Sequence, residues 1–391
     1  MTIGVRRVVL TTALLALSLA FAGCWDAPPI EEVGLVTMMA IDQSPKGELK
    51  VTVSINMPST SSATPGLGQT ATALLRQASG RTLVEAIGHL RTMTYLSLEF
   101  AHLEELFVSE PIAQAGLARP LGYIATSPSF VSTPYLLVVR HGSAENVIEQ
   151  MQAAKPRPEV VVTDTIEQAR KRTPYHPKRV YEFQERVQIP GDQFTTAGVV
   201  VNPAEGSAAT VALEIQGEAL FDRDRLVGWL DEDSTVGWDV ATGQPGHLVL
   251  QLPSGKGGLG LELLRTHRDV HIRHGYTGPT ADMDISVKTR LVAAEGVPAA
   301  WWADPVAVQR MATDAAVKLT HDVIASLQAA QQARADVFSL GEFVRVLDPS
   351  DWSRLETRWD TEGFPNVPVR VHVHVSVDNL GSLVCPAFQA C

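Results

Sequence analysis

Apolar residues recur at two different periods along this chain, which predicts a mixture of strands and helices. In residues 49–57 they alternate with polar residues, as in a strand with one buried face. This strand and the apolar run before it are expected to flank a turn at residues 45–47. From Thr82 the apolar residues recur every three or four positions instead, which is the spacing of a helix.

Strand and helix continue to alternate through the first half of the chain. Residues 103–110 predict a buried strand, and we expect Gly116 and Pro120 to break the helix that follows it. Residues 134–151 predict another buried strand and then a helix that begins at Ser143. This alternation is typical of a mixed α and β fold.

Two stretches of the first half have no such period. Residues 58–72 are rich in Ser, Thr, Pro and Gly and are expected to form a loop. Residues 155–191 have an excess of Lys and Arg and several prolines, so we expect a connection with one or two short, solvated helices there. We place a domain boundary near Pro190–Gly191, which divides the mature chain into an N-terminal region, 24–190, and a C-terminal region, 191–391.

The second half is richer in strands. Residues 217–230 predict a hairpin that turns at Asp222–Asp224, and two long strands are expected at residues 258–274 and 281–296. The last predicted strand covers residues 367–377. Every odd position in it is Val, so one face is expected to be buried and the other to face water.

A long helix is expected at residues 305–332, before this last strand. Asp304 is a favourable N-cap, and Pro305 suits the first helical position. Apolar residues mark one stripe along the helix: Val308, Met311, Ala312, Ala315, Leu319, Val323 and Leu327. We therefore predict an α+β fold in which mixed, largely antiparallel sheets are packed with helices in more than one domain.

Length and charge narrow the class of protein. At 391 residues the chain is too long for one ordinary domain. Its hydrophobic content of 45% is that of a globular protein. The net charge of −11 argues against a nucleic-acid partner, because such a partner favours a basic surface.

The N-terminus has the features of an export signal. Arg6 and Arg7 precede an apolar stretch at residues 8–21, which is shorter than the roughly 20 residues that a membrane span needs. A positive start followed by a short apolar run is typical of a signal peptide. We therefore predict that residues 1–23 are removed on export.

Cys24 follows the small residues Ala22 and Gly23, which is the arrangement of a bacterial lipobox, with Phe21 where Leu is usual. We predict that the Cys24 thiol carries a diacylglyceryl lipid, which would hold the mature chain on the membrane. The alternative is an ordinary secreted protein with a chance cysteine after its cleavage site. Cys385 and Cys391 predict either a small-loop disulfide or two free thiols.

Two groups of histidines are the candidate metal ligands. On a helix, His267, His271 and His274 would share one face and could hold zinc. The flanking sequence is typical of a strand, however, which places His274 on the opposite face, and neighbouring arginines disfavour a cation. His372 and His374 share the wet face of the last strand, and we interpret them as a solvent-facing pair.

Motifs for catalysis are missing from the sequence. The glycine-rich residues 253–260 lack the spacing of a phosphate-binding loop, and neither G-x-S-x-G nor H-E-x-x-H occurs. We therefore predict no catalytic residue, no cofactor and no metal ligand, which leaves Cys24 lipidation as the one assigned site.

Several stretches, taken in order, resemble the Ger(x)C family of spore germination lipoproteins. In this family a lipobox Cys is followed by Trp-Asp and by a strand that ends in Ile-Asp, as in the first matching stretch here. Later stretches resemble the family's N-terminal helix, its hairpin segment and its C-terminal signature. The matching stretches are residues 23–42, 80–90, 96–117, 217–238 and 335–359, the last followed by the Val-rich strand and Gly381. The tail at residues 382–391 matches nothing in the family.

The resemblance implies more than the residue patterns do. It implies three domains, each a sheet packed with helices, and no enzymatic activity or cofactor. It also implies a C subunit of a nutrient germinant receptor, held by its lipid on the outer face of the spore inner membrane beside integral membrane A and B subunits.

Two alternatives belong to other classes. One is a solute-binding lipoprotein that serves a membrane transporter, which would usually have two lobes with parallel strands. The other is a surface-anchored hydrolase, for which no nucleophile or metal motif is found. The alternating Val strand and the hairpin at Asp222–Asp224 favour antiparallel sheet instead, and therefore the receptor subunit.

Overall fold

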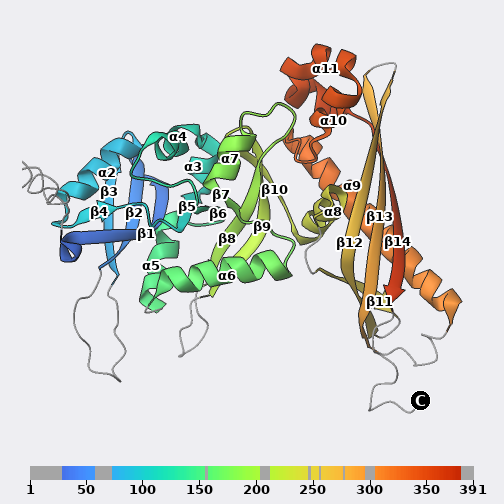
Figure 1. Cartoon of the computed structure of the whole chain (residues 1–391), viewed down its shortest axis with the longest axis horizontal. Helices are drawn as coiled ribbons and strands as arrows, with labels where there is room; N and C mark the ends of the chain where they lie inside the picture. The colour runs from blue at the N-terminus through green and yellow to red at the C-terminus, as the bar shows by residue number, and fades with distance from the viewer. Residues whose placement is uncertain are drawn as a thin grey trace, which may run out of the picture.

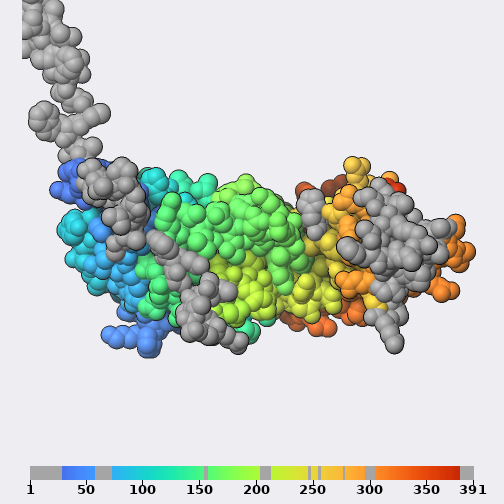
Figure 2. Space-filling model, turned by 90° about the horizontal axis from the view of Figure 1, so that it is seen from below, coloured from blue at the N-terminus to red at the C-terminus, as the bar shows by residue number. Residues whose placement is uncertain are grey.

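The computed structural model describes residues 29–57, 73–154, 157–202, 212–244, 248–254, 257–275, 278–295 and 304–379. These residues form two bodies, each built on one β-sheet, which follow one another along an elongated molecule (Figure 1, Figure 2). The predicted signal peptide, Cys24, the loop predicted at residues 58–72, Cys385 and Cys391 lie outside the described residues.

The first body contains a ten-stranded mixed sheet. Its order is β10-β9-β8-β6-β5-β1-β2-β3, with β4 paired to β1 and β7 to β6. The central pairs β1–β5, β5–β6 and β6–β8 are parallel, and the pairs on either side of them are antiparallel. The strands are β1 (Val33–Gln43), β2 (Leu49–Asn56), β3 (Leu74–Gly80), β4 (Ser97–Glu99), β5 (Glu105–Ser109), β6 (Tyr135–Val139), β7 (Lys178–Arg179), β8 (Thr195–Asn202), β9 (Ala212–Asp222) and β10 (Arg225–Leu230).

Helices cover both faces of this sheet, so its central strands are apolar on both sides, as parallel strands usually are. One face packs on α2 (Leu83–Thr92), α3 (Glu110–Ala115), α4 (Ala118–Thr126) and α7 (Val180–Arg186). The other packs on α5 (Ala144–Ala154) and α6 (Pro158–Arg172). A 3-10 turn, η1 (Ile30–Glu32), precedes β1.

Short polar side chains begin the helices of this body. The Thr82 hydroxyl accepts the Glu85 amide N–H at the start of α2, over 3.2 Å, and the Ser143 hydroxyl accepts the Asn146 N–H at the same distance. Each bond satisfies an amide that has no partner within its helix. The predicted helix starts at Thr82 and Ser143 are therefore confirmed.

Gly116 and Pro120 have different roles, although both were expected to break a helix. Gly116 does end α3, with a φ of 117° that favours glycine. The prediction for Pro120 was wrong, because it lies in the first turn of α4. An amide N–H there would have no acceptor within the helix, so a proline costs little.

The sheet continues past the boundary that the sequence suggested near Pro190–Gly191. Strands β8, β9 and β10 all follow that position, and β8 pairs with β6 of the same sheet. The second sheet begins only with β11, at Val249. The division between the two sheets therefore falls between β10 and β11, after the boundary that we expected near residue 190.

The second body contains a four-stranded sheet of order β11-β12-β13-β14. Its strands are β11 (Val249–Ser254), β12 (Gly257–His274), β13 (Pro279–Ala294) and β14 (Val369–Asn379). Buried and accessible residues alternate along β13, so one face packs on helices and the other faces solvent. Its helical elements are α8 (Glu232–Thr242), α9 (Pro305–Ala333), α10 (Leu340–Leu347), α11 (Pro349–Leu355), the 3-10 turns η3 (Glu356–Arg358) and η5 (Phe364–Asn366), and the π-helical turn η4 (Trp359–Gly363).

The last strand pairs differently from what its pattern suggested. The alternation of Val with polar residues is confirmed, since His372 and His374 are exposed and Val373 is buried. However, β14 runs parallel to β13, not antiparallel. The reason is the connection: α9, α10 and α11 carry the chain back across the sheet before β14 begins, as in a crossover between parallel strands.

The predicted long helix is confirmed as α9. The Asp304 carboxylate accepts the Val306 N–H over 2.9 Å, and Pro305 takes the first helical position. The inner side of the helix packs in the core of the second body, through Met311, Ala315, Leu319, Val323 and Leu327.

We expect the contact between α8 and α9 to be sensitive to one methyl group. A Cβ at Gly237 would overlap the Asp322 carbonyl oxygen and lie 2.6 Å from the Val323 nitrogen. G237A should therefore lower the free energy of unfolding by about 1–3 kcal/mol, measured by urea denaturation of the purified protein. G122A is the matched control in α4, because the space around Gly122 is open, and it should raise stability by up to about 1 kcal/mol. Equal effects of the two variants would contradict the packing argument.

Candidate functional site

The two bodies meet at a buried polar cluster around His176, which lies between α6 and β7. The ring Nε2 of His176 contacts the carboxylate Oδ1 of Asp239, on α8. The His176 backbone N–H donates to Glu218 Oε2, on β9, over 3.0 Å. Figure 1 shows α8 between the two sheets, so the cluster joins β9, next to one edge of the first sheet, to the helix that opens the second body.

Burial changes the protonation of this cluster. It raises the pKa of Glu218 to about 7, although the His176 imidazole and N–H and the Thr195 hydroxyl favour the ionised form. Burial also raises the pKa of Asp239 well above its usual range and lowers that of His176. Glu218 Oε1 and Asp239 Oδ2 have no hydrogen-bond partner within the described part of the chain. Glu218 therefore exchanges a proton near neutral pH, at the contact between the bodies.

A second buried carboxylate organises the contact beside α10. Asp336 accepts the backbone N–H of Leu340 (3.0 Å), that of Gly341 (2.7 Å) and the indole N–H of Trp359 (2.8 Å). Burial raises its pKa to about 7, against the effect of these three donors. The Asp336 carbonyl oxygen accepts the Gln193 N–H over 3.0 Å, so the same residue also holds the segment before β8.

Two glycines allow this segment to approach α10 closely. A Cβ at Gly191 would lie 2.8 Å from the Gly341 Cα, and a Cβ at Gly341 would lie 2.6 Å from the Gly191 Cα. Gly191 also has a φ of 77°, which disfavours any side chain. Beside them, the Ser339 hydroxyl donates to Asp192 Oδ1 over 2.9 Å.

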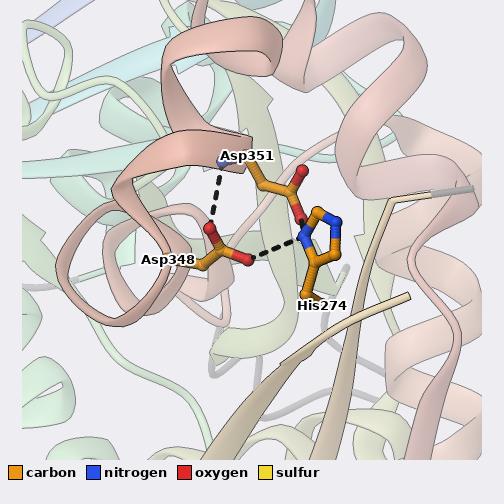
Figure 3. A group of neighbouring side chains, drawn as sticks. All are labelled: His274, Asp348 and Asp351. Atoms are coloured by element: carbon orange, nitrogen blue, oxygen red, sulfur yellow. Dashed lines mark hydrogen bonds and ion pairs between the residues drawn. The ribbon is translucent and has the colours of Figure 1, made fainter. Parts of the chain in front are cut away.

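A third cluster lies at the end of the second sheet and joins His274, Asp348 and Asp351 (Figure 3). The His274 Nδ1 lies 2.7 Å from Asp351 Oδ2 and 3.2 Å from Asp348 Oδ2. Asp348 Oδ1 accepts the Asp351 N–H over 3.1 Å, which caps α11. The Ser350 hydroxyl, and after it His274, lower the pKa of Asp348.

One imidazole and two carboxylates are donors that a divalent cation could use, and the three ligand atoms lie within 4.8 Å of one another. These donor atoms are already engaged, however. The His274 nitrogen faces both carboxylates, and Arg354 forms an ion pair with Asp351. The arrangement fits a polar contact that fixes α11 to β12 better than it fits a metal centre.

The other predicted histidines do not join this cluster. His267 and His271 are exposed on the wet face of β12, where they lie near Asp269 (3.4 Å) and Asp284 (4.0 Å). His274 is on the opposite face, as the strand interpretation required. His372 and His374 share the wet face with His267 and His271, and Ser286 on β13 pairs in register with both His267 and His374.

The buried cluster was missed by sequence reasoning. Its signal was weak: Glu218 and Asp239 are single acids within apolar segments, at residues 217–221 and 236–241. A lone acid at an apolar position indicates a buried charge that needs a partner. His176 lies in the basic segment at residues 155–191, and no sequence pattern links it to Glu218 or Asp239.

Comparison with known proteins decides the family. A model described as the spore germination protein N-terminal domain matches residues 26–199, and a model described as spore germination B3/GerAC-like, C-terminal, matches residues 216–381. The chain belongs to the Ger(x)C family of spore germination proteins. The two models meet between residues 199 and 216, within the first sheet of this Ger(x)C protein.

Similar proteins align with almost the whole length of this chain. Spore germination protein KC of Bacillus subtilis (strain 168) is 20% identical and aligns over 96% of this chain and 97% of its own. The putative spore germination protein YfkR of the same organism is 22% identical and aligns over 94% of this chain and 96% of its own. The crystal structure of the GerBC protein matches with a TM-score of 0.56 and 16% identity, over 87% of this chain and 97% of that one, which shows a shared fold.

Among the residues that the structure describes, no helix of this Ger(x)C protein is long and apolar enough to cross a membrane.

The raised pKa of Glu218 predicts a pH dependence of stability. The folded state keeps this proton up to about pH 7, whereas an unfolded Glu with a pKa of 4.5 loses it earlier. The favourable contribution is therefore complete below pH 4.5 and is lost as pH rises through 7, by roughly 3 kcal/mol in all. In E218Q, stability should fall less between pH 5 and pH 8, as measured by urea unfolding at each pH. E214Q, an exposed acid on the same strand, should behave like the wild type, and an unchanged slope in E218Q would contradict the assignment.

Because the acids beside His274 already have partners, we expect metal ions to leave the thermal stability unchanged. Adding EDTA, or a tenfold excess of Zn²⁺ or Ca²⁺, should leave the thermal midpoint within about 1 °C, because a cation would have to displace Arg354. Differential scanning fluorimetry of the protein and of H274A measures this. A midpoint that rises with metal in the wild type, but not in H274A, would identify a metal site instead.

Proposed function

We propose that this protein is the membrane-anchored lipoprotein subunit of a nutrient germinant receptor and acts in spore germination without catalysis, by assembling with integral membrane A and B subunits. The observation that carries the proposal is the ordered match of the two spore germination models to residues 26–199 and 216–381. The relatives that align along nearly their whole length are also named as spore germination proteins.

Anchoring through Cys24 is part of this proposal. The first described strand begins at Val33, nine residues after Cys24. Even a fully extended segment of that length spans only about 30 Å. A lipid on Cys24 would therefore hold the first body close to the membrane, where integral membrane subunits could contact it.

The polar clusters support a structural, non-catalytic role. Asp336 uses both carboxylate oxygens to accept backbone and indole N–H groups, and His274 is paired with two acids. These side chains connect helices and strands to one another. A protein that transmits a signal through contacts needs connections of this kind between its parts.

Deletion of the gene tests the function. Spores of a strain that has no paralogous receptor should lose the germination response to at least one nutrient, scored by loss of optical density and release of dipicolinic acid. The response should return when the gene is restored. Normal germination of the deletion strain with every nutrient tested would refute the proposal.

Cys24 replacement tests the anchor separately. C24A should shift the protein from the membrane fraction to the soluble fraction, because one thioether-linked diacylglyceryl group supplies the membrane affinity. C385A, which changes a cysteine outside the proposed lipobox, is the matched control and should stay on the membrane. A C24A protein that remains membrane-bound and functional would show that the lipid is dispensable.

A further inference from the structure

A small polar cavity lies against the buried His176 cluster, at the contact between the bodies. Its volume is about 230 Å³, which is smaller than most drug-sized ligand sites and suits a small molecule or ion. Polar atoms form nearly all of its wall. The lining residues are Tyr135, Arg170, His176, Pro177, Lys178, Arg179, Tyr181, Glu182 and Gln244.

Two guanidinium groups converge on one oxygen at this wall. Arg170 Nη1 donates to the Tyr135 hydroxyl over 3.1 Å, and Arg179 Nη2 donates to the same hydroxyl over 3.0 Å. The Arg179 guanidinium also stacks on the Tyr135 ring, 4.0 Å from its centroid. These contacts fix two like charges close together, which is unfavourable unless anions lie nearby.

A third cation faces the same cavity. The Lys178 side chain is largely buried, and its Nζ lies 3.6 Å from Glu182 Oε1. That distance is an ion pair but exceeds a good hydrogen bond, so the ammonium has donors to spare. Glu182 is also engaged at the start of α7, where its Oε2 accepts the Arg179 N–H over 2.8 Å.

The acids near the cavity do not balance these cations. Glu182 is the one carboxylate among the lining residues, and beside them Glu167 accepts the Tyr135 hydroxyl and forms an ion pair with Arg170 over 3.4 Å. These two acids face three cations, Arg170, Lys178 and Arg179. Glu218 and Asp239 lie behind His176, and burial raises the pKa of both, which reduces the negative charge that they contribute. A local excess of positive charge therefore remains at a partly desolvated, polar site, where an anion would be held most strongly.

We propose that this cavity, between Arg170, Lys178 and Arg179, binds a small anion that carries a carboxylate or a phosphate group. Planar guanidinium groups suit both kinds of oxygen anion, and Lys178 adds a point charge. Gln244, just after α8, closes the cavity from the side of the second body. A bound anion would thus contact both bodies. The inference goes beyond the germination role and does not depend on it.

Titration of the purified mature protein tests the proposal. Inorganic phosphate and succinate are added in separate arms, each against sodium chloride at equal ionic strength, and binding is followed by calorimetry and by the thermal midpoint. We expect saturable binding of at least one of the two anions. Phosphate alone would identify a phosphate-bearing ligand, and succinate alone a carboxylate-bearing one. Binding of neither would overturn the proposal.

Variants locate the binding. R170Q and K178Q should each weaken it about tenfold or more, because each removes one charge from the cavity wall. K171Q is the matched control, since Lys171 is exposed on the same helix as Arg170 and does not line the cavity. Undiminished binding in both R170Q and K178Q would overturn the proposal.

E182Q should change the anion affinity in the opposite direction. This variant still tests the proposal if the arginine or lysine variants fail to fold. It removes the one carboxylate among the lining residues, while the amide oxygen of Gln can still accept the Arg179 N–H. Binding should become about three- to tenfold tighter. Unchanged or weaker binding in an E182Q protein with a normal thermal transition would count against an anion in this cavity.

Discussion

The arrangement of the two bodies depends on the hydrogen bonds that the buried Asp336 accepts. Its carboxylate holds the first turn of α10 and the Trp359 indole, while its carbonyl oxygen holds Gln193 in the first body. A buried carboxylate is costly unless its oxygens are paired, and here both oxygens are. Loss of this side chain would leave three buried donors without an acceptor at once, so the start of α10 and the turn at Trp359 depend on the same carboxylate.

The His176 cluster supplies the second connection, and it differs in kind. Asp336 has every oxygen satisfied, whereas Glu218 and Asp239 each keep one oxygen without a partner in the described part of the chain. The Asp336 oxygens all have hydrogen-bond donors, whereas Glu218 and Asp239 can each still accept a proton or a hydrogen bond. The polar cavity opens beside this second contact, so the part of the junction that can respond to its surroundings is also the part that offers a binding site.

Local patterns predicted the elements well, because strand and helix periods and N-caps are properties of neighbouring residues. The caps at Thr82, Ser143 and Asp304 and the exposed face of β14 could all be predicted in this way. Pairing between distant strands could not. Strand β8 joins β6 across the basic connection, and β14 joins β13 after three helices, so neither partner is visible in a local window. His176 meets Asp239 across 63 positions for the same reason. The family resemblance predicted the family because it depends on the order of many short stretches.

The end-to-end placement of the two bodies has a mechanical consequence. In Figure 2 the N-terminal elements lie at one end of the molecule and α9 with the second sheet at the other. The contact between the bodies includes two facing glycines, Gly191 and Gly341, whose backbones approach closely without side chains between them. Any rotation at this contact would displace the far end of the second sheet more than the residues beside the contact, because displacement grows with distance from the axis of rotation.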